Sequence, residues 1–303
     1  MKLLDRFGSK RFVLIAVFCL VPFGTNAGNR LVVYTVNYPL QYFAERIAGE
    51  HAEVHFPAVA DVDPAFWKPD DETVDGYQKA DLILRNGAGY AQWVDQVSLP
   101  HHRLVNTSAA FADAYIPVGD AFTHSGGPAA ERSHSGTAFT TWLDFYQAAQ
   151  QAEAVMQALS RQRPQQQAEF ERNYAALKQD LMALDLDMQR LVAAHPGKQM
   201  FVSQPVYQYF ARRYELQLES VIWQPDVMPE ERDWEQLVYA QETFPALWML
   251  WGDTPDAEIR ARLQSIGVGV VVFRPCANRP PQGDFLSVMR RNLDNLKIAF
   301  AEP

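Results

Sequence analysis

Histidine and cysteine are the side chains in this sequence best suited to bind a transition metal or to act in nucleophilic catalysis. His124 and His134 lie ten residues apart in a segment rich in Gly, Ser, Ala and Pro. We interpret this pair as part of a solvated loop, with weak metal capture as the alternative. Cys276 follows a predicted buried strand and has no activating histidine close after it. We therefore expect a packed or lightly exposed thiol and not a catalytic one.

Sequence motifs for catalysis are missing from the chain. It contains no G-x-S-x-G, H-E-x-x-H, P-loop or G-x-G-x-x-G pattern. Residues 86–90 (NGAGY) follow a predicted strand, but they are too short a match for a phosphate-binding loop. We predict that the protein is not an enzyme.

The elements that must position any site alternate between strand and helix patterns. Runs of β-branched and apolar residues indicate strands, and segments with helical apolar spacing follow them. In the first half, strands are predicted at 31–36, 51–58, 81–87 and 102–108, and helices at 38–49, 72–80 and 91–98. Residues 109–138 show no period and are predicted to form a loop, and the α/β rhythm returns from residue 199 onward. Repeated β-α-β units favour a parallel sheet covered by helices.

The most regular segment, residues 165–194, is predicted to form one long helix. Apolar residues recur at alternating spacings of four and three from Phe170 to Leu191, which places them on one helix face. Pro164 precedes the helix at a position that a helix start tolerates, and residues 195–197 (HPG) end it. About 30 residues with a rise of 1.5 Å each span roughly 45 Å, which is enough to cross a domain.

These patterns predict an α/β protein with two lobes, each a mostly parallel sheet flanked by helices, joined by one long bridging helix. The hydrophobic fraction of 48% and the charged fraction of 21% suit an ordinary globular core. The expected organisation is a signal peptide at 1–27, an N-terminal lobe at 28–163, the bridging helix at 164–195 and a C-terminal lobe at 196–303.

The first 27 residues have the composition of a cleavable secretory leader. Four basic residues precede or flank the start of an apolar run at 12–23, and Ala27 ends the leader with a small side chain. The run is too short to span a bilayer, and no cysteine directly follows it. We therefore expect a periplasmic protein that is not a lipoprotein. Cys276 would be the only cysteine after cleavage, which leaves no internal disulfide.

The charge of the chain argues against one class of partner. The formal net charge is −9 at pH 7, and the leader is itself basic, so the chain without it is more acidic still. A strongly acidic chain without a basic cluster binds a phosphate backbone poorly. We expect no nucleic-acid partner.

Four segments and their order resemble the zinc/manganese (metal-specific, adhesin-like) family of periplasmic substrate-binding proteins of ABC transporters. They are residues 38–49 (YPLQYFAERIAG), 66–84 (FWKPDDETVDGYQKADLIL), 140–155 (TTWLDFYQAAQQAEAV) and 201–216 (FVSQPVYQYFARRYEL). The resemblance covers roughly residues 30 to 300. It implies two lobes bridged by a long helix, with one metal ion held between them by histidines and carboxylates.

The resemblance also implies four ligand positions, and three of them lack the expected histidine. Ala65 offers no donor atom, whereas Thr140 and Gln204 offer neutral oxygens, which are weak zinc ligands. The fourth position falls near Trp251, with a carboxylate two residues further on. This chain therefore resembles a divergent member of the family. The residues that remain as candidates for direct metal binding are Asp253, His124 and His134.

Aromatic residues lie at or beside the implied ligand positions. Aromatic surface with a few hydrogen-bonding groups suits an organic ligand. Core packing is the alternative role for these aromatic side chains. The predicted ligand site consists of Ala65, Phe66, Trp67, Thr140, Trp142, Gln204, Tyr207, Trp251 and Asp253.

We predict that the protein is the periplasmic solute-binding component of a metal-type ABC importer. A chelate already satisfies the coordination shell of its ion, so we expect a chelated metal, such as a siderophore-like iron complex, and not a bare ion. The expected partners are an inner-membrane ABC permease, the small-molecule chelate and, as an option, a second metal-binding periplasmic protein. No cofactor is expected beyond a metal carried as a chelate.

Two alternative functions stay open. In the first, the protein is an accessory or interaction protein without solute binding, which assists a metal-binding partner or the permease. In the second, the protein binds zinc, manganese or iron directly but weakly.

Overall fold

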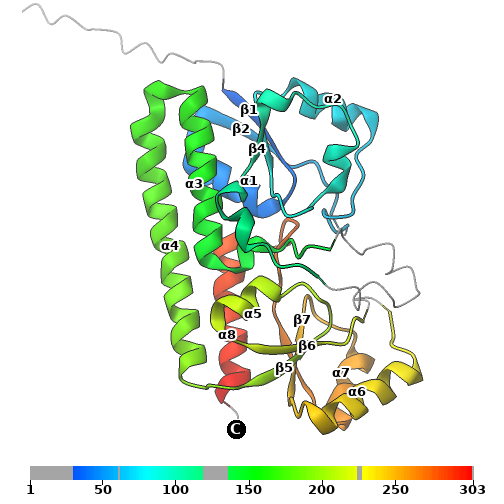
Figure 1. Ribbon diagram of the computed structural model, residues 1–303. Helices are drawn as coiled ribbons and strands as arrows, with labels where there is room; N and C mark the ends of the chain where they lie inside the picture. Colours follow the sequence, from blue (N-terminus) through cyan, green and yellow to red (C-terminus); the bar gives the residue numbers. More distant parts are fainter. Residues whose placement is uncertain (1–29, 61, 119–135, 224–226, 302–303) are drawn as a thin grey trace, which may run out of the picture.

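The computed structural model describes residues 30–60, 62–118, 136–223 and 227–301. Two four-stranded sheets lie in separate lobes, with a long helix that runs beside both (Figure 1). Every strand pair in the two sheets is parallel. The prediction of two parallel-sheet α/β lobes with a long helix between them is confirmed.

The first sheet has the strand order β2-β1-β3-β4. Its strands are β1 (Leu31–Thr35), β2 (Ala52–His55), β3 (Leu82–Arg85) and β4 (Leu104–Asn106). The central strand β3 is apolar and buried along most of its length, because helices and loops cover both faces of the sheet. The crossovers contain α1 (Tyr38–Ala48) and α2 (Asp71–Lys79). Asn37 caps α1 by accepting a hydrogen bond from the Leu40 amide.

One predicted helix of the first lobe is wrong. Residues 91–98 form only the short 3₁₀ helix η2 (Gln92–Asp95). Ala91 precedes it with a φ of 53°, in the left-handed region, and Pro100 follows closely. The few residues between them are too short a segment to sustain an α-helix. The other 3₁₀ helices described in this lobe are η1 (Gly49–His51), η3 (His101–Arg103) and η4 (Ala109–Ala114).

The second sheet repeats the arrangement of the first, with the strand order β6-β5-β7-β8. Its strands are β5 (Gln199–Val202), β6 (Gln217–Ser220), β7 (Trp248–Trp251) and β8 (Gly269–Val272). The connecting helices are α5 (Gln208–Tyr214), α6 (Glu231–Thr243) and α7 (Ala257–Ser265). Strand, helix and strand alternate here as the sequence pattern predicts.

Two long helices connect the sheets. α3 (Phe145–Gln162) and α4 (Gln167–Ala193) lie side by side, joined by η8 (Pro164–Gln166) (Figure 1). The 27 residues of α4 span about 40 Å, and they bury the apolar face predicted for residues 165–194. The apolar pattern did not predict α3. Its buried residues are mostly alanine and glutamine, which are not specific to a buried helix face, so the pattern of large apolar side chains seen in α4 is missing here.

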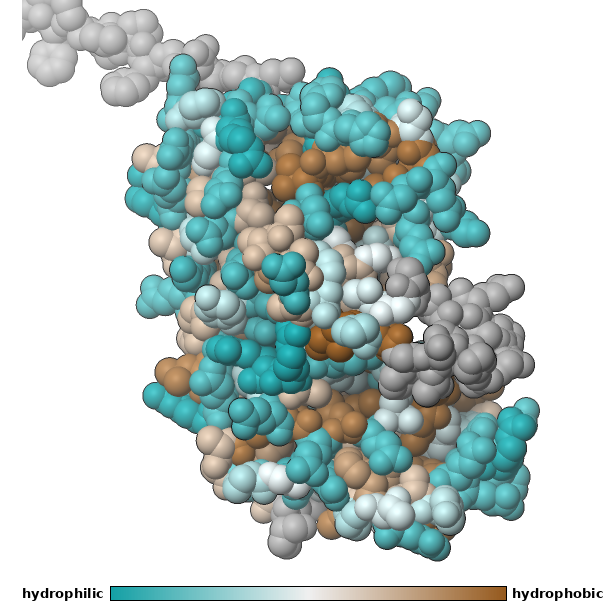
Figure 2. Space-filling view, viewed as in Figure 1, coloured by the Kyte–Doolittle hydropathy of each residue, from teal (hydrophilic) through white to brown (hydrophobic). Residues whose placement is uncertain are grey.

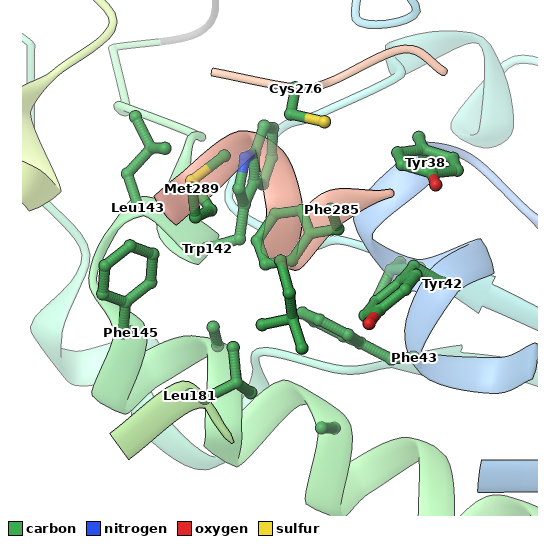
Figure 3. Packing of buried hydrophobic residues seen from close by; sticks show 14 of the residues in the cluster. Tyr38, Tyr42, Phe43, Trp142, Leu143, Phe145, Leu181, Cys276, Phe285 and Met289 are labelled. Carbon is green, nitrogen blue, oxygen red and sulfur yellow. The ribbon is translucent and has the colours of Figure 1, made fainter. Parts of the chain in front are cut away.

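The C-terminal helix α8 (Phe285–Ala301) completes the centre of the molecule. The Phe285 ring meets the ring of Phe43 from α1 edge-on, with 5.5 Å between the centroids. Figure 3 shows these rings together with Trp142 and with Leu181 of α4. The same buried cluster includes residues of both sheets, so one hydrophobic core connects the two lobes.

The surface in view is mostly hydrophilic. Figure 2 shows apolar surface over the first lobe and at the level between the lobes. Within the described part of the chain, every helix is too short or too polar to cross a membrane.

Candidate functional site

The turn that contains Ala65 belongs to the first lobe and is held by Asp63. The amides of Phe66 and Trp67 donate to the Asp63 carbonyl at 3.0 and 3.1 Å. The Ala65 amide donates to the Asp63 carboxylate at 3.0 Å. Such an aspartate turn needs no metal to hold its shape. It buries the methyl group of Ala65, which has no donor atom, at the first implied ligand position.

The two aromatic residues of this turn contact different partners. The Phe66 ring lies edge-on to Phe139, with 6.5 Å between centroids, and Phe139 directly precedes Thr140. The Trp67 ring lies edge-on to Trp93, at 6.2 Å. Phe66 therefore lies near the second implied ligand position, whereas Trp67 packs on the aromatic core of the first lobe.

Thr140 and Trp142 connect the first lobe to the second. Trp142 belongs to the 3₁₀ helix η7 (Thr141–Leu143), and Thr140 directly precedes it. The Thr140 hydroxyl donates to the Val206 carbonyl at 2.5 Å, and the Trp142 indole N–H donates to the Pro275 carbonyl at 2.8 Å. Both side chains are buried. Both predicted site residues therefore bond to the backbone of the other lobe.

Gln204 and Tyr207 approach the same junction from the second lobe. The Gln204 carbonyl accepts a hydrogen bond from the Val206 amide at 2.9 Å, and Val206 in turn accepts the bond from Thr140. The Tyr207 hydroxyl donates to the Phe273 carbonyl at 2.8 Å. Burial raises the pKa of Tyr207 far above its ordinary value, so the phenol stays neutral. The structure thus brings Thr140, Gln204 and Tyr207 close together.

Trp251 and Asp253 lie at the end of β7 and have different surroundings. Trp251 is buried in a smaller core of the second lobe, where its ring lies 6.1 Å from that of Trp223. It therefore packs apart from Trp67 and Trp142. Asp253 is exposed and accepts hydrogen bonds from Arg274 at 2.5 and 3.2 Å. Burial raises the pKa of Asp253, but the hydrogen bonds from Arg274 and from the Thr254 amide outweigh it, so the net pKa is lowered.

The donor set at the four implied positions does not fit a bare transition-metal ion. Ala65 has no donor, the Thr140 hydroxyl is used between the lobes, and Asp253 already has a cationic partner. Across the residues that the structure describes, no group of three or more His, Cys, Asp or Glu side chains is placed to hold a metal. His124 and His134 lie outside the described residues. Cys276 is buried, as predicted for a packed thiol.

The loop after β3 contains a residue that the sequence prediction missed. Tyr90 is only 3% exposed, and its ring lies 5.3 Å from Phe139 and 5.7 Å from Trp142, measured between centroids. Its hydroxyl has no hydrogen-bond partner among the residues that the structure describes. Burial, and then the negative charge of Asp63, raise the pKa of Tyr90 well above its ordinary value. The glycine and alanine residues around this tyrosine, directly after a strand, were the available sequence signal.

The backbone around Tyr90 is strained. The φ angles of Gly87, Ala88, Gly89 and Ala91 are 80°, 52°, 75° and 53°, all in the left-handed region. Alanine reaches that region only at a steric cost. A side chain at Gly87 would place its Cβ 2.1 Å from the Ser108 hydroxyl oxygen. Residues 87–91, which we call the Tyr90 loop, therefore need a rigid surrounding to keep this conformation.

A buried hydrogen-bond network supplies that surrounding. The Asn86 side chain donates to the Phe139 carbonyl at 2.9 Å and accepts from Asn37 and Gln151 at 3.2 and 3.1 Å. Ser108 donates to the Asn86 carbonyl at 2.6 Å. The network ties the ends of β1, β3 and β4 to α3, so it fixes the start of the Tyr90 loop.

Two parallel α/β lobes beside a continuous helix, with side chains from both lobes at their junction, form the architecture that the sequence resemblance implies. Residues 33–299 match the family described as "Zinc-uptake complex component A periplasmic", and the chain belongs to this family. The predicted resemblance is confirmed. The family consists of solute-binding proteins and not of enzymes, as predicted.

The relatives are distant in sequence but similar in fold. The zinc-binding lipoprotein AdcA of Streptococcus pneumoniae is 23% identical over 280 residues, which cover 89% of this chain and 56% of that protein. The chain thus spans about half of AdcA. The zinc-uptake protein ZnuA of Bacillus subtilis is 25% identical over 311 residues, covering 94% of this chain and 95% of ZnuA. The structure of zinc-bound AdcA has a TM-score of 0.76 at 20% identity, covering 90% of this chain and 58% of that chain. A mutant of FpvC from Pseudomonas aeruginosa also gives 0.76, at 17% identity and with 90% and 100% coverage.

Proposed function

We propose that this chain is the periplasmic solute-binding component of a metal-type ABC importer and that it binds its metal as a preformed chelate. The observation that supports binding of a chelate is the lack of available metal-ligand atoms at the implied ligand positions. Ala65 has no ligand atom, Thr140 is engaged between the lobes, and Asp253 is paired with Arg274. A chelate brings its own donor atoms, so the protein has to supply only shape, aromatic contact and hydrogen bonds.

The remainder of the proposal follows from the family and the leader. Relatives named as zinc-binding support metal uptake as the process in which the chain acts. We propose an inner-membrane ABC permease as its docking partner and a cleavable leader without a lipid anchor. AdcA is named a lipoprotein, so this form of localisation differs from that relative.

Titration calorimetry tests the choice between chelate and bare ion. The metal-stripped protein is titrated with Zn²⁺, Mn²⁺ and Fe³⁺ salts and, separately, with iron(III) trihydroxamate and iron(III) tricatecholate complexes. We expect submicromolar binding of a chelate and only weak binding of the salts. Submicromolar affinity for a free ion that is lost in Asp253→Ala would contradict the proposal and support direct metal binding.

A second candidate function is an accessory role without solute binding. The observations in its favour are the bonds that Thr140 and Trp142 make across the junction and the exposed apolar residues on α6. Tyr239 is 70% exposed there, next to Val238. This function predicts that no chelate binds and that Val238→Glu with Tyr239→Ser impairs growth under metal limitation. Unimpaired growth of a strain with this double variant would exclude it.

A further inference from the structure

Tyr90 has a hydroxyl group that the described part of the folded chain leaves without a hydrogen-bond partner. Two other buried tyrosines are paired with backbone carbonyl groups: Tyr77 donates to Thr35 at 2.8 Å and Tyr209 donates to Ala138 at 2.9 Å. Among the described residues, Tyr90 is the only tyrosine with a buried and unpaired hydroxyl. Burial of a polar group without a hydrogen bond costs stability. Phenylalanine would fill the same space without this cost, so the hydroxyl indicates a role other than stabilising the fold.

The backbone on both sides of Tyr90 is conformationally strained, which is a second energetic cost in addition to the unpaired hydroxyl. Ala88 and Ala91, on either side of it, both have positive φ angles. Strained backbone that the surrounding structure keeps in place is typical of binding and catalytic sites. The Asn86 network supplies the necessary rigidity. Two independent costs therefore meet at one residue.

Tyr90 also lies where the predicted site residues converge. Its ring contacts Phe139, which precedes Thr140, and Trp142, which bonds to Pro275 of the second lobe. Asp63, which holds the turn of Ala65, is close enough to raise the pKa of Tyr90. The Tyr90 ring thus packs on residues at the junction of the lobes, and its hydroxyl lies within electrostatic reach of the turn at the first implied ligand position.

We infer that the Tyr90 hydroxyl donates a hydrogen bond to an oxygen atom of the ligand bound between the lobes. This inference rests on the proposed function. The neighbouring charge of Asp63 disfavours a free anion and favours an oxygen whose charge a metal has already balanced. The oxygens of a neutral iron(III) trihydroxamate have this property, whereas an iron(III) tricatecholate keeps a net negative charge. The ligand reaches the buried hydroxyl when the contacts of Thr140 and Trp142 with the second lobe open.

Two single-atom variants test the inference. Tyr90→Phe and the matched control Tyr77→Phe each remove one buried hydroxyl from the full chain. We expect Tyr90→Phe to raise the melting temperature by about 2 °C and to weaken binding of the neutral iron(III) trihydroxamate about tenfold. Tyr77→Phe is expected to lower the melting temperature, because it leaves the Thr35 carbonyl unpaired, and to leave the affinity unchanged.

Each outcome decides the inference. A lower or unchanged melting temperature of Tyr90→Phe would show that the hydroxyl has a protein partner, and it would overturn the inference. Equal chelate affinity of Tyr90→Phe and the unsubstituted protein overturns the inference alone. No chelate binding by the unsubstituted protein overturns the proposed function and the inference with it. A visible iron–phenolate absorption with Fe³⁺ salt that disappears in Tyr90→Phe also overturns it, because the tyrosine would then bind the metal directly.

Discussion

Each implied ligand position whose side-chain contacts the structure describes has a local role that competes with metal binding. Ala65 fills the inside of a turn that Asp63 closes. Thr140 bonds to the Val206 carbonyl, and Asp253 is paired with Arg274. A cation at Asp253 would have to displace an arginine, which opposes it electrostatically. Local contacts of the folded chain thus occupy the side chains at these positions.

The carboxylate of Asp144 gives a pH dependence at the residue scale. It caps α3 by accepting bonds from the Tyr146 and Gln147 amides. Burial raises its pKa, although these amides and Arg213 act in the opposite direction. The folded state therefore binds a proton more readily than the unfolded state, so the destabilisation is present above the folded pKa and is relieved as the pH falls through it.

Asp144→Asn tests this sign. The amide oxygen still caps the helix, but the charge is gone. We expect the unsubstituted protein to gain stability relative to Asp144→Asn as the pH falls from about 7 to about 4, the range in which carboxyl groups take up protons. Urea unfolding at the two pH values measures the difference. If the two proteins differ by the same free energy of unfolding at both pH values, the expectation is contradicted.

Among the elements, α4 and α5 are tied together by one buried carboxylate. Asp185 on α4 is 2% exposed and accepts bonds from Arg213 at 2.9 and 2.6 Å. Tyr214 and Gln189 donate to the same carboxylate at 2.9 and 2.6 Å. This arrangement satisfies the charge that a polar residue brings into the buried face of the long helix.

Arg213→Met is expected to destabilise the protein by about 3 kcal/mol, because it leaves Asp185 buried without its cation. The matched control is Arg212→Met at the preceding position, which loses an exposed bond to the Ala114 carbonyl and a contact with the Tyr209 ring but leaves no buried charge. We expect less than about 1 kcal/mol for this control. Chemical unfolding of both variants provides the comparison. A similar decrease in the free energy of unfolding of both variants would show that the pairing of Arg213 with Asp185 adds no stability beyond that of an exposed arginine contact.

The Tyr90 loop gives a second prediction for the elements. Gly87→Ala is expected to cost about 3 kcal/mol or more, because its Cβ would collide with Ser108 and its φ is 80°. Gly267→Ala is the control, since its φ of 81° matches that of Gly87, it ends a helix in a Schellman turn, and no described atom lies within 4 Å of its Cβ. Only the conformational cost of about 1 kcal/mol applies there. Equal melting temperatures of the two variants would contradict the crowding at Gly87.

Sequence periodicity predicted the elements with strong apolar patterns and failed where other forces decide. The apolar face from Phe170 onward predicted α4 because seven apolar residues recur at helical spacing. α3 was missed because alanine and glutamine fill its buried face. The partners of Thr140, Trp142 and Asp253, and the position of Tyr90, depend on contacts between distant segments. Such contacts have no local sequence signal, so the candidate site was less predictable than the fold.

At the scale of the whole molecule, the lobes share one hydrophobic core. The cluster that contains Phe43 and Trp142 also includes residues of the second sheet. We expect a single unfolding transition, with coincident curves from far-ultraviolet circular dichroism and tryptophan fluorescence. Tryptophans report on both lobes, since Trp93 belongs to the first and Trp251 to the second. Two separate transitions would contradict the shared core.

The position of α8 in the centre of the molecule has a consequence for synthesis. A chain is made from its first residue onward, so Phe285 is added long after its partner Phe43. Until then, the apolar faces of α1 and α4 lack the helix that covers them (Figure 3). A prematurely terminated chain therefore leaves hydrophobic surface open to chaperones and proteases. Only chains that include the last helix can bury these apolar faces and complete the core.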